Sequence, residues 1–553
     1  MQPKGYSGSK KVAIVGSGCA GFGAAWALKN TDYEIHLFEK DVRLGGHTNT
    51  QPFSTSNGQI SVDTGFIVMN SATYPNFIGF LNAVGVTPVP TEMTFAVSRD
   101  RGKFEWSGDG KGVFAQRRNL FRPGHWRLIF DVIRFNQYAL DLLDKEDDVS
   151  RSLTIGKYLD REGYSQAFTD GYLIPMTAAV WSTSPDKASL EFPAQTLIRF
   201  MWNHHLLSTI ATRPDWLTIA GGSQRYIDAI LESLGDQLRL HLSSQVRGIA
   251  RPSASSKNRT AVSWVDKEGN TSDDMFDHVI LACHGDQILP MIADSVQIEK
   301  LHDGSSSCKW PCCNDSVIYP SKAESTQSGA TQQELEIFSA FKTSENICYL
   351  HSDLSLMPNR RNTWSSWNYM INSTPSQSAS PAGVSLTYNM NILQHISQRK
   401  YGHVLVTMNP GHEPRPNLTQ GKYIYRHPLY TVEAVRAQER LESIQNQRGV
   451  SYCGAWTKYG FHEDGFSSGL KVAKEHLGAK LPFEFVDSTY SRGLTRELAW
   501  QDYAVRALVW FICMMINTGS LLLRIPLVWL PAKITLNVFS AFLEELEHAR
   551  IID

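Results

Sequence analysis

The stretch from Lys11 to Glu39 constrains the fold more than any other part of the chain. An apolar run, VAIV at positions 12–15, ends at the turn GSGCAG. An alanine-rich segment with helical character continues to Leu28, and a second apolar run ends in Glu39. This order of strand, glycine turn, helix, strand and acid predicts a dinucleotide-binding βαβ unit.

The glycines of this turn have separate physical roles. Gly16 permits the tight turn after the strand, Gly18 lets the backbone approach a pyrophosphate, and Gly21 lets the helix pack closely on the strand. Free N–H groups at the helix N-terminus attract the phosphates, and the acid accepts hydrogen bonds from ribose hydroxyls. The predicted cofactor contacts in this unit are Gly16, Ser17, Gly18, Ala20, Gly21, Glu39 and Lys40.

A second glycine turn follows the acid and distinguishes between nucleotides. The sequence RLGGHT at 43–48, followed by SVDTGF at 61–66, resembles the flavin-containing amine oxidase and phytoene desaturase superfamily. The resemblance implies that the ligand is FAD rather than NAD, and that the DTG strand lies near the isoalloxazine. It adds Arg43, Gly45, Gly46, His47, Asp63 and Gly65 to the predicted cofactor contacts.

Later segments continue this resemblance. The backbone of Val246 is the implied adenine contact, and CGAWTKYGFHEDGFSSG at 453–469 is a second cofactor signature that includes Gly454 and Gly465. Many members carry an acid directly after that first glycine to bind the ribityl chain, whereas this chain has Ala455. We therefore expect the polar role to pass to Glu463 or Asp464.

The motifs HSDLSLMP, WSSWNYM, YNMNILQ and MNP narrow the resemblance further. Together with the second signature they resemble a group of predicted FAD/NAD-binding oxidoreductases, often encoded beside cyclopropane-fatty-acid-synthase-like methyltransferases. The resemblance covers roughly residues 10–475. It implies flavin redox chemistry on a lipid-like substrate.

The implied fold is α/β, with a Rossmann-like FAD-binding domain and an interleaved α+β substrate domain, in the two-domain architecture of the amine oxidases. The length of 553 residues agrees with two or more domains. The expected segments are 1–75, 216–290 and 441–475 for the FAD domain, 76–215 and 291–440 for the substrate domain, with a surface insertion at 302–334, and 476–553 for a C-terminal extension.

Composition excludes some classes of partner and cofactor. A net charge of -1 without a basic cluster argues against nucleic acid. The cysteine cluster Cys308, Cys312 and Cys313 lacks a second ligand pair, so no metal site is predicted. The polar N-terminus favours an intracellular protein without a cleaved secretory signal. No cysteine or histidine is in a position typical of a covalent flavin link, so FAD is expected to bind non-covalently.

The sequence does not single out a catalytic group. Weak candidates for a base are His351 and Asp353, where a strand ends in LHSD, and His462 in the second signature. Lys342 lies near the segment that holds the lysine of amine oxidases, although a solvated surface lysine is the better interpretation. Segments rich in aromatic and histidine residues predict a substrate cavity with Trp181, His204, Trp364 and Trp367 in its wall.

The C-terminal segment 504–542 is strongly apolar but is interrupted by Asn517, Pro526 and Pro531. Three interpretations remain open: a membrane-spanning helix, an interfacial or hairpin anchor bordered by Trp510 and Trp529, and a helix packed on the enzyme's own core. An anchor would suit an enzyme that takes its substrate from a membrane.

The sequence thus predicts an FAD-dependent oxidoreductase that dehydrogenates, desaturates or isomerises a small hydrophobic substrate, most plausibly a fatty-acyl lipid. An amine oxidase is the alternative within the same class. A flavin- or lipid-binding scaffold for a methyltransferase, without turnover, is the alternative in another class. The substrate, the electron acceptor and the oligomeric state stay open.

Overall fold

The computed structural model describes residues 10–100, 102–108, 112–144, 152–181, 190–207, 214–251, 259–293, 329–371, 385–490, 492 and 496–522. The chain divides into two compact units. Unit 1 comprises Met1–Pro90, Leu217–Asn346 and Ile424–Ser488, and unit 2 comprises Thr91–Trp216, Ile347–Tyr423 and Thr489–Asp553. The predicted cysteine cluster Cys308, Cys312 and Cys313 lies outside the described residues.

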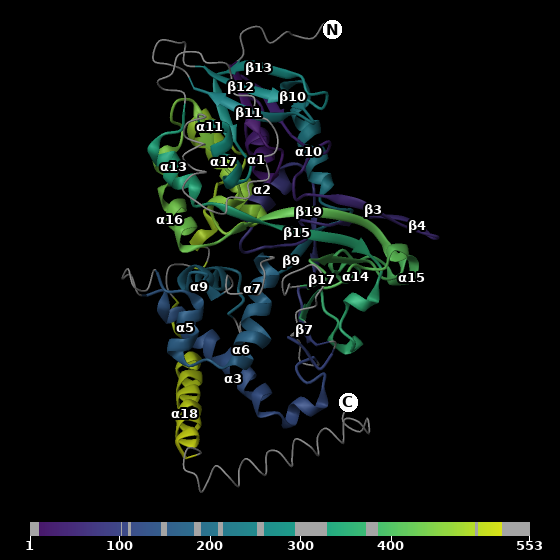
Figure 1. Ribbon diagram of the computed structural model, residues 1–553, viewed down its shortest axis with the longest axis vertical. Helices are drawn as coiled ribbons and strands as arrows, with labels where there is room; N and C mark the ends of the chain where they lie inside the picture. The colour runs from purple at the N-terminus through teal and green to yellow at the C-terminus, as the bar shows by residue number, and fades with distance from the viewer. Residues whose placement is uncertain are drawn as a thin grey trace. The chain divides into compact units, whose positions relative to one another are not determined.

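The centre of unit 1 is a parallel five-stranded sheet in the order β10-β2-β1-β14-β20, of which Figure 1 labels β10. Its strands are β1 (Lys10–Val15), β2 (Tyr33–Phe38), β10 (Leu238–His241), β14 (His278–Leu281) and β20 (Val450–Tyr452). Val15 pairs with Phe38 on one side and with Leu281 on the other, so these three strands end together at one edge of the sheet. The predicted βαβ unit is therefore present in the predicted register.

Alternating residues of β1 send apolar side chains to both faces of this sheet, because successive side chains of a strand point in opposite directions. Val12 and Ile14 belong to a core shared with α1 (Cys19–Ala27), α2 (Pro75–Ala83), α10 (Gln224–Leu234) and α17 (His462–Leu477). Ala13 and Val15 belong to the core on the opposite face. That face is covered by β11 (Gln245–Ala250), β12 (Thr260–Val265), β13 (Thr271–Phe276), α11 (Leu289–Ile292), α13 (Gln332–Ser339) and α16 (Val432–Arg440).

Glycines bring α1 and α17 unusually close together. A Cβ on Gly469 would stand 2.0 Å from the carbonyl oxygen of Ala20, and one on Gly23 would stand 2.5 Å from that of Phe466. A Cβ on Gly465 would stand 2.4 Å from Cys19 Sγ. The GFSSG sequence of the second signature is thus required for helix packing. The smaller strands of unit 1 are β3 (Thr50–Thr55), β4 (Gly58–Asp63), β5 (Met69–Asn70), β6 (Pro88–Thr91) and β9 (Trp216–Ile219).

Most strands of unit 2 belong to a seven-stranded mixed sheet in the order β19-β15-β18-β17-β16-β7-β8. The strands are β7 (Phe95–Arg99), β8 (Phe104–Ser107), β15 (Lys342–His351), β16 (Trp367–Ile371), β17 (Ser385–Asn389), β18 (Leu405–Met408) and β19 (Thr419–Leu429). The helices are α3 (Pro123–Tyr138), α5 (Ile155–Glu162), α6 (Gln166–Phe168), α7 (Ile174–Trp181), α9 (Ala194–Asn203), α14 (Met390–Leu393), α15 (Gln398–Tyr401) and α18 (Trp500–Leu522).

The segments differ from the expected ones; residues 476–488, for example, which we assigned by sequence to the C-terminal extension, lie in unit 1. Residues 76–90, 291–346 and 424–440, which we assigned by sequence to the substrate domain, lie in unit 1. The first of these segments contains α2, whose N-terminus is held by Glu463 of α17. The second contains α13, whose Glu334 pairs with Arg251 at the end of β11. Helix α13 also begins inside the stretch that we predicted to be a surface insertion.

Candidate functional site

The turn between β1 and α1 has the geometry that a pyrophosphate site requires. Gly16 has a positive φ of 106°, and a Cβ there would stand 2.9 Å from the carbonyl oxygen of Ala282. A Cβ on Gly21 would stand 1.9 Å from the carbonyl oxygen of Gly16, so helix and turn are in direct contact. At Gly18, by contrast, a Cβ would meet nothing within 4 Å. The space in front of Gly18 is therefore open.

The N-terminus of α1 keeps its positive end available. No side chain caps the helix at Gly18, and the first turn contains no acidic residue. Because the first N–H groups of a helix lack partners within the helix, such an end attracts an anion. Open space at Gly18 and uncapped N–H groups fit the pyrophosphate of a dinucleotide.

Glu39 stands beside this turn. Its side chain is 8% exposed, and its Oε2 accepts hydrogen bonds from the backbone N–H of Ser17 at 3.0 Å and from Ser17 Oγ at 2.6 Å. Ser17 Oγ in turn accepts from the N–H of Gly45 at 3.2 Å. The acid thus joins the first glycine turn to the second, at the edge where a ribose is expected. Lys40, the next residue, is exposed.

The second glycine turn lies against the first. Gly45 and Gly46 both have positive φ, and a Cβ on Gly46 would stand 3.2 Å from Gly18 Cα. Arg43 donates from Nη2 to the carbonyl oxygen of Gly46 at 2.7 Å, so its guanidinium braces its own loop. The carbonyl oxygen of His47 accepts from the N–H of Phe66 at 2.9 Å, and a Cβ on Gly65 would stand 2.1 Å from that oxygen.

Three predicted cofactor carboxylates are engaged by the protein itself. Asp63 accepts from Ser223 at both N and Oγ, and from Thr50 Oγ1. Glu463 accepts from the N–H groups of Asn76 and Phe77, from Asn76 Nδ2 and from Ser467 Oγ. Asp464 accepts from the N–H of Phe461, three residues before it, and so caps its own helix.

These contacts give the three acids roles within the protein. Asp63 fixes the loop before α10, and Glu463 satisfies the N-terminus of α2, which has no side-chain cap of its own. Contact of Glu463 or Asp464 with the ribityl chain stays a prediction, and both carboxylates also have partners within the protein. Burial raises the pKa of Glu463 to about 7 and that of Asp464 to about 6, although the donated hydrogen bonds act in the opposite direction.

Val246 lies in β11, where the pairing with β12 shifts register between Val246 and Gly248. Gly454 follows β20, and its N–H donates to Ser468 Oγ of α17 at 2.9 Å. Both residues therefore lie in unit 1 with the other predicted cofactor contacts, and their contacts with adenine and ribityl stay predictions. Ala20 packs at the start of α1 against Gly469, and Gly465 packs against Cys19, so both serve the helix contact.

Two of the catalytic candidates, His351 and Asp353, lie in unit 2 and make contacts that stabilise the fold. His351 and Asp353 are fully buried in unit 2. His351 Nδ1 accepts from the N–H of Asp353 at 3.0 Å, and its Nε2 lies 2.6 Å from Thr407 Oγ1. Asp353 accepts from Arg415 at N, Nε and Nη2. These buried, fully bonded groups do not fit a base that meets a substrate.

The other two catalytic candidates lie in unit 1. Lys342 is exposed at the start of β15, as expected for a solvated lysine. His462 stacks on Phe66 with ring centroids 3.8 Å apart, and burial lowers the pKa of its imidazole to about 3. Its Nε2 is buried and has no hydrogen-bond partner in the described part of the chain. His462 is thus part of an aromatic cluster.

The predicted cavity residues have separate neighbours in unit 2. The ring of His204 lies against that of Phe200, with centroids 4.0 Å apart and an interplanar angle of 34°. Trp364 donates to the carbonyl oxygen of Pro358 at 2.8 Å, and the ring of Trp367 meets that of Tyr388. Trp181 ends α7, and its side chain lies outside the described atoms. The described contacts do not bring Trp364 and Trp367 together in one aromatic cage.

Three histidines that sequence reasoning did not combine meet at the edge of the sheet. The ring centroid of His47 lies 5.1 Å from that of His427 and 5.7 Å from that of His284. His284 follows β14 directly, and His427 lies in β19. Only His47 was predicted as a cofactor contact. The signal for His284 was its place at the end of a buried strand, where ligand-binding residues of parallel sheets gather.

Fold and site together define a two-domain flavin-dependent oxidoreductase. Residues 19–306, slightly more than half of the chain, match the family described as flavin containing amine oxidoreductase. The chain belongs to this family, and its cofactor is FAD. The expected family, fold class and cofactor are thereby confirmed.

Individual relatives are distant. An L-amino acid dehydrogenase from Synechocystis sp. is 24% identical over 257 residues, which make up 44% of this chain and 52% of that protein. The chain thus spans about half the length of this curated relative. Putrescine oxidase bound to putrescine has 12% identity and a TM-score of 0.55, with 85% of this chain and 99% of that chain covered. A fatty acid isomerase from P. acnes has 13% identity, a TM-score of 0.53 and the same coverage.

A first prediction concerns His462. Its pKa of about 3 lies below the ordinary 6.5, so the folded protein binds fewer protons than the unfolded chain, and stability falls as pH falls from 6.5 towards 3. His462→Phe keeps the stack on Phe66 and removes this loss. We expect the free energy of unfolding of the variant, from urea titrations, to rise relative to that of wild type as pH is lowered from 7 to 5, by up to about 1.4 kcal/mol per pH unit below 6.5. An equal difference at both pH values would contradict this.

Proposed function

We propose that the enzyme dehydrogenates, desaturates or isomerises a hydrophobic substrate, and that this substrate is a fatty-acyl lipid. The observation that carries the proposal is the apolar outer face of α18. Leu508, Trp510, Phe511 and Met515 are between 49% and 64% exposed. Such a surface favours an enzyme that takes its substrate from a lipid phase.

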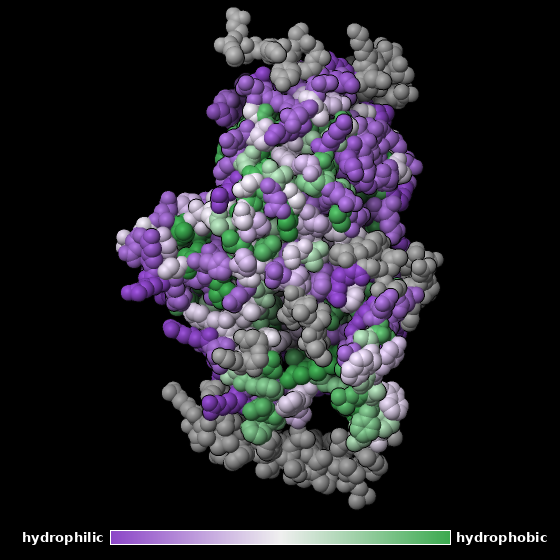
Figure 2. All heavy atoms as spheres, turned by 180° about the vertical axis from the view of Figure 1, so that it is seen from behind, coloured by the Kyte–Doolittle hydropathy of each residue, from purple (hydrophilic) through white to green (hydrophobic). Residues whose placement is uncertain are grey.

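The inner face of α18 explains how the helix is held. Arg506 donates to both carboxylate oxygens of Asp141, and Tyr138 donates to the carbonyl oxygen of Arg506. Val509 is buried. From Ala507 to Leu522 the helix carries no charged residue. Figure 2 shows apolar side chains at the lower right of the view, above the grey residues, which is where the 180° turn from Figure 1 brings α18.

None of the described helices is long and apolar enough to cross a membrane. We propose that α18 lies in a membrane surface, with Trp510 at the level of the lipid headgroups.

The described cysteines, Cys19, Cys283, Cys348, Cys453 and Cys513, are all free, which supports a reducing intracellular compartment.

Trp510→Ser/Phe511→Ser tests this placement. We expect the double variant to lose most of its binding to phospholipid vesicles, because two large apolar side chains no longer enter the bilayer interface. Co-sedimentation with vesicles measures the bound fraction, and Ile424→Ser, which removes an exposed apolar side chain of unit 1, serves as control. Equal vesicle binding by wild type and double variant would argue against the interfacial position.

Bound FAD would supply an acceptor for a hydride from the substrate. The chain's own contribution is to bind and orient the cofactor: the α1 N-terminus would hold the pyrophosphate, and Glu39 would hold the ribose.

We propose that FAD binds non-covalently, because burial raises the pKa of the Cys19 and Cys283 thiols to about 12 and keeps them protonated and unreactive. Acid precipitation of the holoenzyme should therefore release the flavin into the supernatant.

The comparisons support two substrate classes. The fatty acid isomerase and putrescine oxidase share the fold, and the L-amino acid dehydrogenase is a distant relative in sequence. The separate surroundings of Trp364 and Trp367 give no support to an aromatic cage for an amine. An amine oxidase is therefore the second candidate, and a flavin-binding scaffold for a methyltransferase is the third.

Anaerobic reduction distinguishes these functions. The holoenzyme is mixed with fatty acids, acyl phospholipids, amines or L-amino acids, and absorbance near 450 nm is followed. Bleaching by an acyl compound supports the proposal, whereas bleaching by amines or amino acids alone overturns it. A flavin that dithionite reduces but no candidate substrate does would favour the scaffold. Because a redox-neutral isomerisation leaves the flavin oxidised, product analysis of the acyl mixtures accompanies the spectra.

A further inference from the structure

The His47, His284 and His427 rings form one cluster, built by three separated segments. His47 follows Gly46, and a Cβ added at Gly46 would stand 3.2 Å from Gly18 Cα. His284 comes two residues after Ala282, whose carbonyl oxygen limits the space at Gly16. The ring of His427 stacks on that of His47 with an interplanar angle of 24°. The cluster thus adjoins both glycine turns of the FAD site.

The hydrogen bonding of His427 fixes its tautomer. Asn346 Nδ2 lies 2.7 Å from His427 Nδ1 and also donates to the carbonyl oxygen of Ser344 at 3.3 Å. A carbonyl oxygen can only accept, so the amide presents its N–H₂ group here. Nδ1 of His427 is then the acceptor, and Nε2 carries the proton. Among the described residues, the contact with Asn346 at Nδ1 is the one hydrogen bond that the His427 side chain forms, so Nε2 is left to donate to a ligand.

The cluster is neutral at physiological pH. Burial lowers the pKa of each of the three imidazoles to about 3. Nearby positive charges act in the same direction: Arg43 faces His47, and Arg426 and Lys40 face His284. The nearby carboxylate, Asp286, is paired with Arg426 at 2.9 Å and accepts from Thr343 Oγ1. His462 also faces His47 and is itself neutral.

We propose that His427, oriented by Asn346 and packed against His47 and His284, is a further FAD-binding residue that donates a hydrogen bond from neutral Nε2–H to an acceptor of the flavin. The inference rests on the FAD site and adds to it a residue far from both glycine signatures. A neutral donor polarises the flavin without adding a charge, and its contribution does not change with pH near neutrality. Asn346 is a positioning residue, because it acts through His427.

Affinity for FAD tests the proposal without reference to turnover. Apoprotein is titrated with FAD, and quenching of flavin fluorescence gives Kd between pH 6 and 8. We expect His427→Phe to weaken binding about tenfold, since it leaves a flavin acceptor unpaired. His427→Gln, which retains an N–H donor, should recover most of that loss. His476→Phe makes the same change elsewhere in unit 1 and should bind FAD like wild type.

The pH profile tests the protonation state. With a neutral donor, the ratio of Kd for His427→Phe to Kd for wild type stays constant from pH 6 to 8. Asn346→Asp places a carboxylate against Nδ1, which raises the pKa of His427 and makes the donor a cation. In that variant affinity should fall as pH rises through the raised pKa. If the ratio of Kd for His427→Phe to Kd for wild type fell between pH 6 and 8, the proposal of a neutral donor would be wrong.

The outcomes separate this inference from the proposed function. If His427→Phe binds FAD as tightly as wild type, and the absorption spectrum of the bound flavin is unchanged, His427 does not touch the cofactor and the inference fails while the FAD site stands. If wild-type apoprotein binds no FAD at all, the proposed function fails first. Far-ultraviolet circular dichroism of each variant shows whether a loss of affinity follows from loss of fold.

Discussion

Gly18→Ala should leave unit 1 folded and weaken FAD binding on the order of 100-fold, about 2.7 kcal/mol. A Cβ at this position meets no protein atom within 4 Å. The backbone angle φ of Gly18 is -67°, which any residue adopts without strain. The added methyl group therefore costs the apoprotein nothing, but it occupies the space in which a pyrophosphate approaches the helix N-terminus.

Two variants provide matched comparisons. Gly124→Ala also adds a methyl group where nothing lies within 4 Å, but at the start of α3 in unit 2, so Kd for FAD should not change. Gly21→Ala forces a Cβ to within 1.9 Å of the carbonyl oxygen of Gly16, and we expect loss of fold as well as of FAD. If Gly18→Ala bound FAD with the wild-type Kd, the pyrophosphate would have to lie elsewhere.

The sequence predicts this part of the site well, because the information is local. Gly16, Gly18, Gly21 and Glu39 lie within one βαβ unit, and each has a role set by backbone geometry. The parallel strands place Glu39 next to the turn at Ser17, as the spacing required. For residues that lie close together in sequence within one βαβ unit, the spacing therefore predicts their relative positions in space.

The roles of residues in the second signature are less predictable from sequence, because these residues contact partners far away in the chain. Glu463 caps a helix that begins almost four hundred positions earlier, at Pro75. Gly465 faces Cys19 of α1. The glycine-rich run GFHEDGFSSG contains residues for both helix packing and helix capping, and sequence alone does not say which acid faces the ligand. The same limit applies to His427, whose stacking on His47 depends on tertiary packing.

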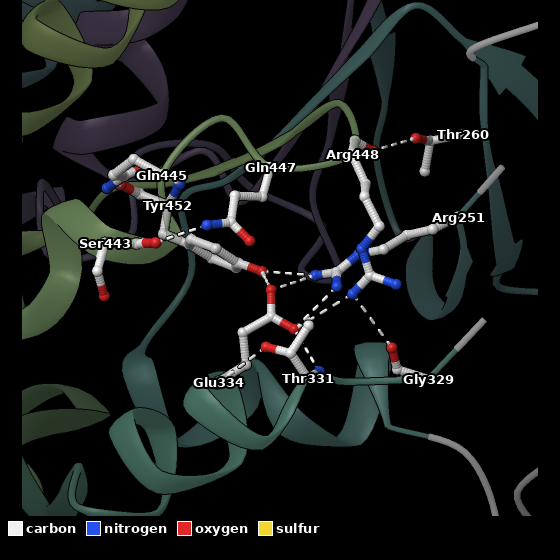
Figure 3. A network of polar contacts seen from close by, with 10 residues as sticks. All are labelled: Arg251, Thr260, Gly329, Thr331, Glu334, Ser443, Gln445, Gln447, Arg448 and Tyr452. Atoms are coloured by element: carbon white, nitrogen blue, oxygen red, sulfur yellow. Dashed lines mark hydrogen bonds and ion pairs between the residues drawn. The ribbon is translucent and has the colours of Figure 1, made fainter. Parts of the chain in front are cut away.

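Glu334→Gln should destabilise unit 1 by about 3–5 kcal/mol, because it leaves a buried cation without its counterion. The side chains of Arg251 and Glu334 are 0% and 1% exposed and form two hydrogen bonds of 2.8 and 2.7 Å. Tyr452 of β20 donates to Glu334 Oε1 and also accepts from Arg251, and Arg448 lies 3.7 Å from the same carboxylate (Figure 3).

This network joins three segments that are far apart in sequence. Glu334 also closes the capping box of α13 with Thr331, so the variant weakens the start of that helix as well. The hydrogen bonds from Arg251 hold the pKa of Glu334 below its usual value despite burial. Ionised Glu334 therefore contributes to the stability of unit 1 at pH values above the pKa that this carboxyl has in the unfolded chain. The contribution is lost as pH falls below that pKa.

Release of FAD during urea unfolding reports on unit 1. The urea midpoints of the variants are compared at pH 7.5. Glu336→Gln is the control, because Glu336 lies on the same helix and pairs with Arg440 while 47% exposed. It should not shift the midpoint measurably, since surface pairs contribute little. Arg251→Met/Glu334→Leu removes both charges and should recover most of the stability lost in Glu334→Gln. A midpoint for Glu334→Gln equal to that of Glu336→Gln would show that the buried pair does not hold α13 to the sheet.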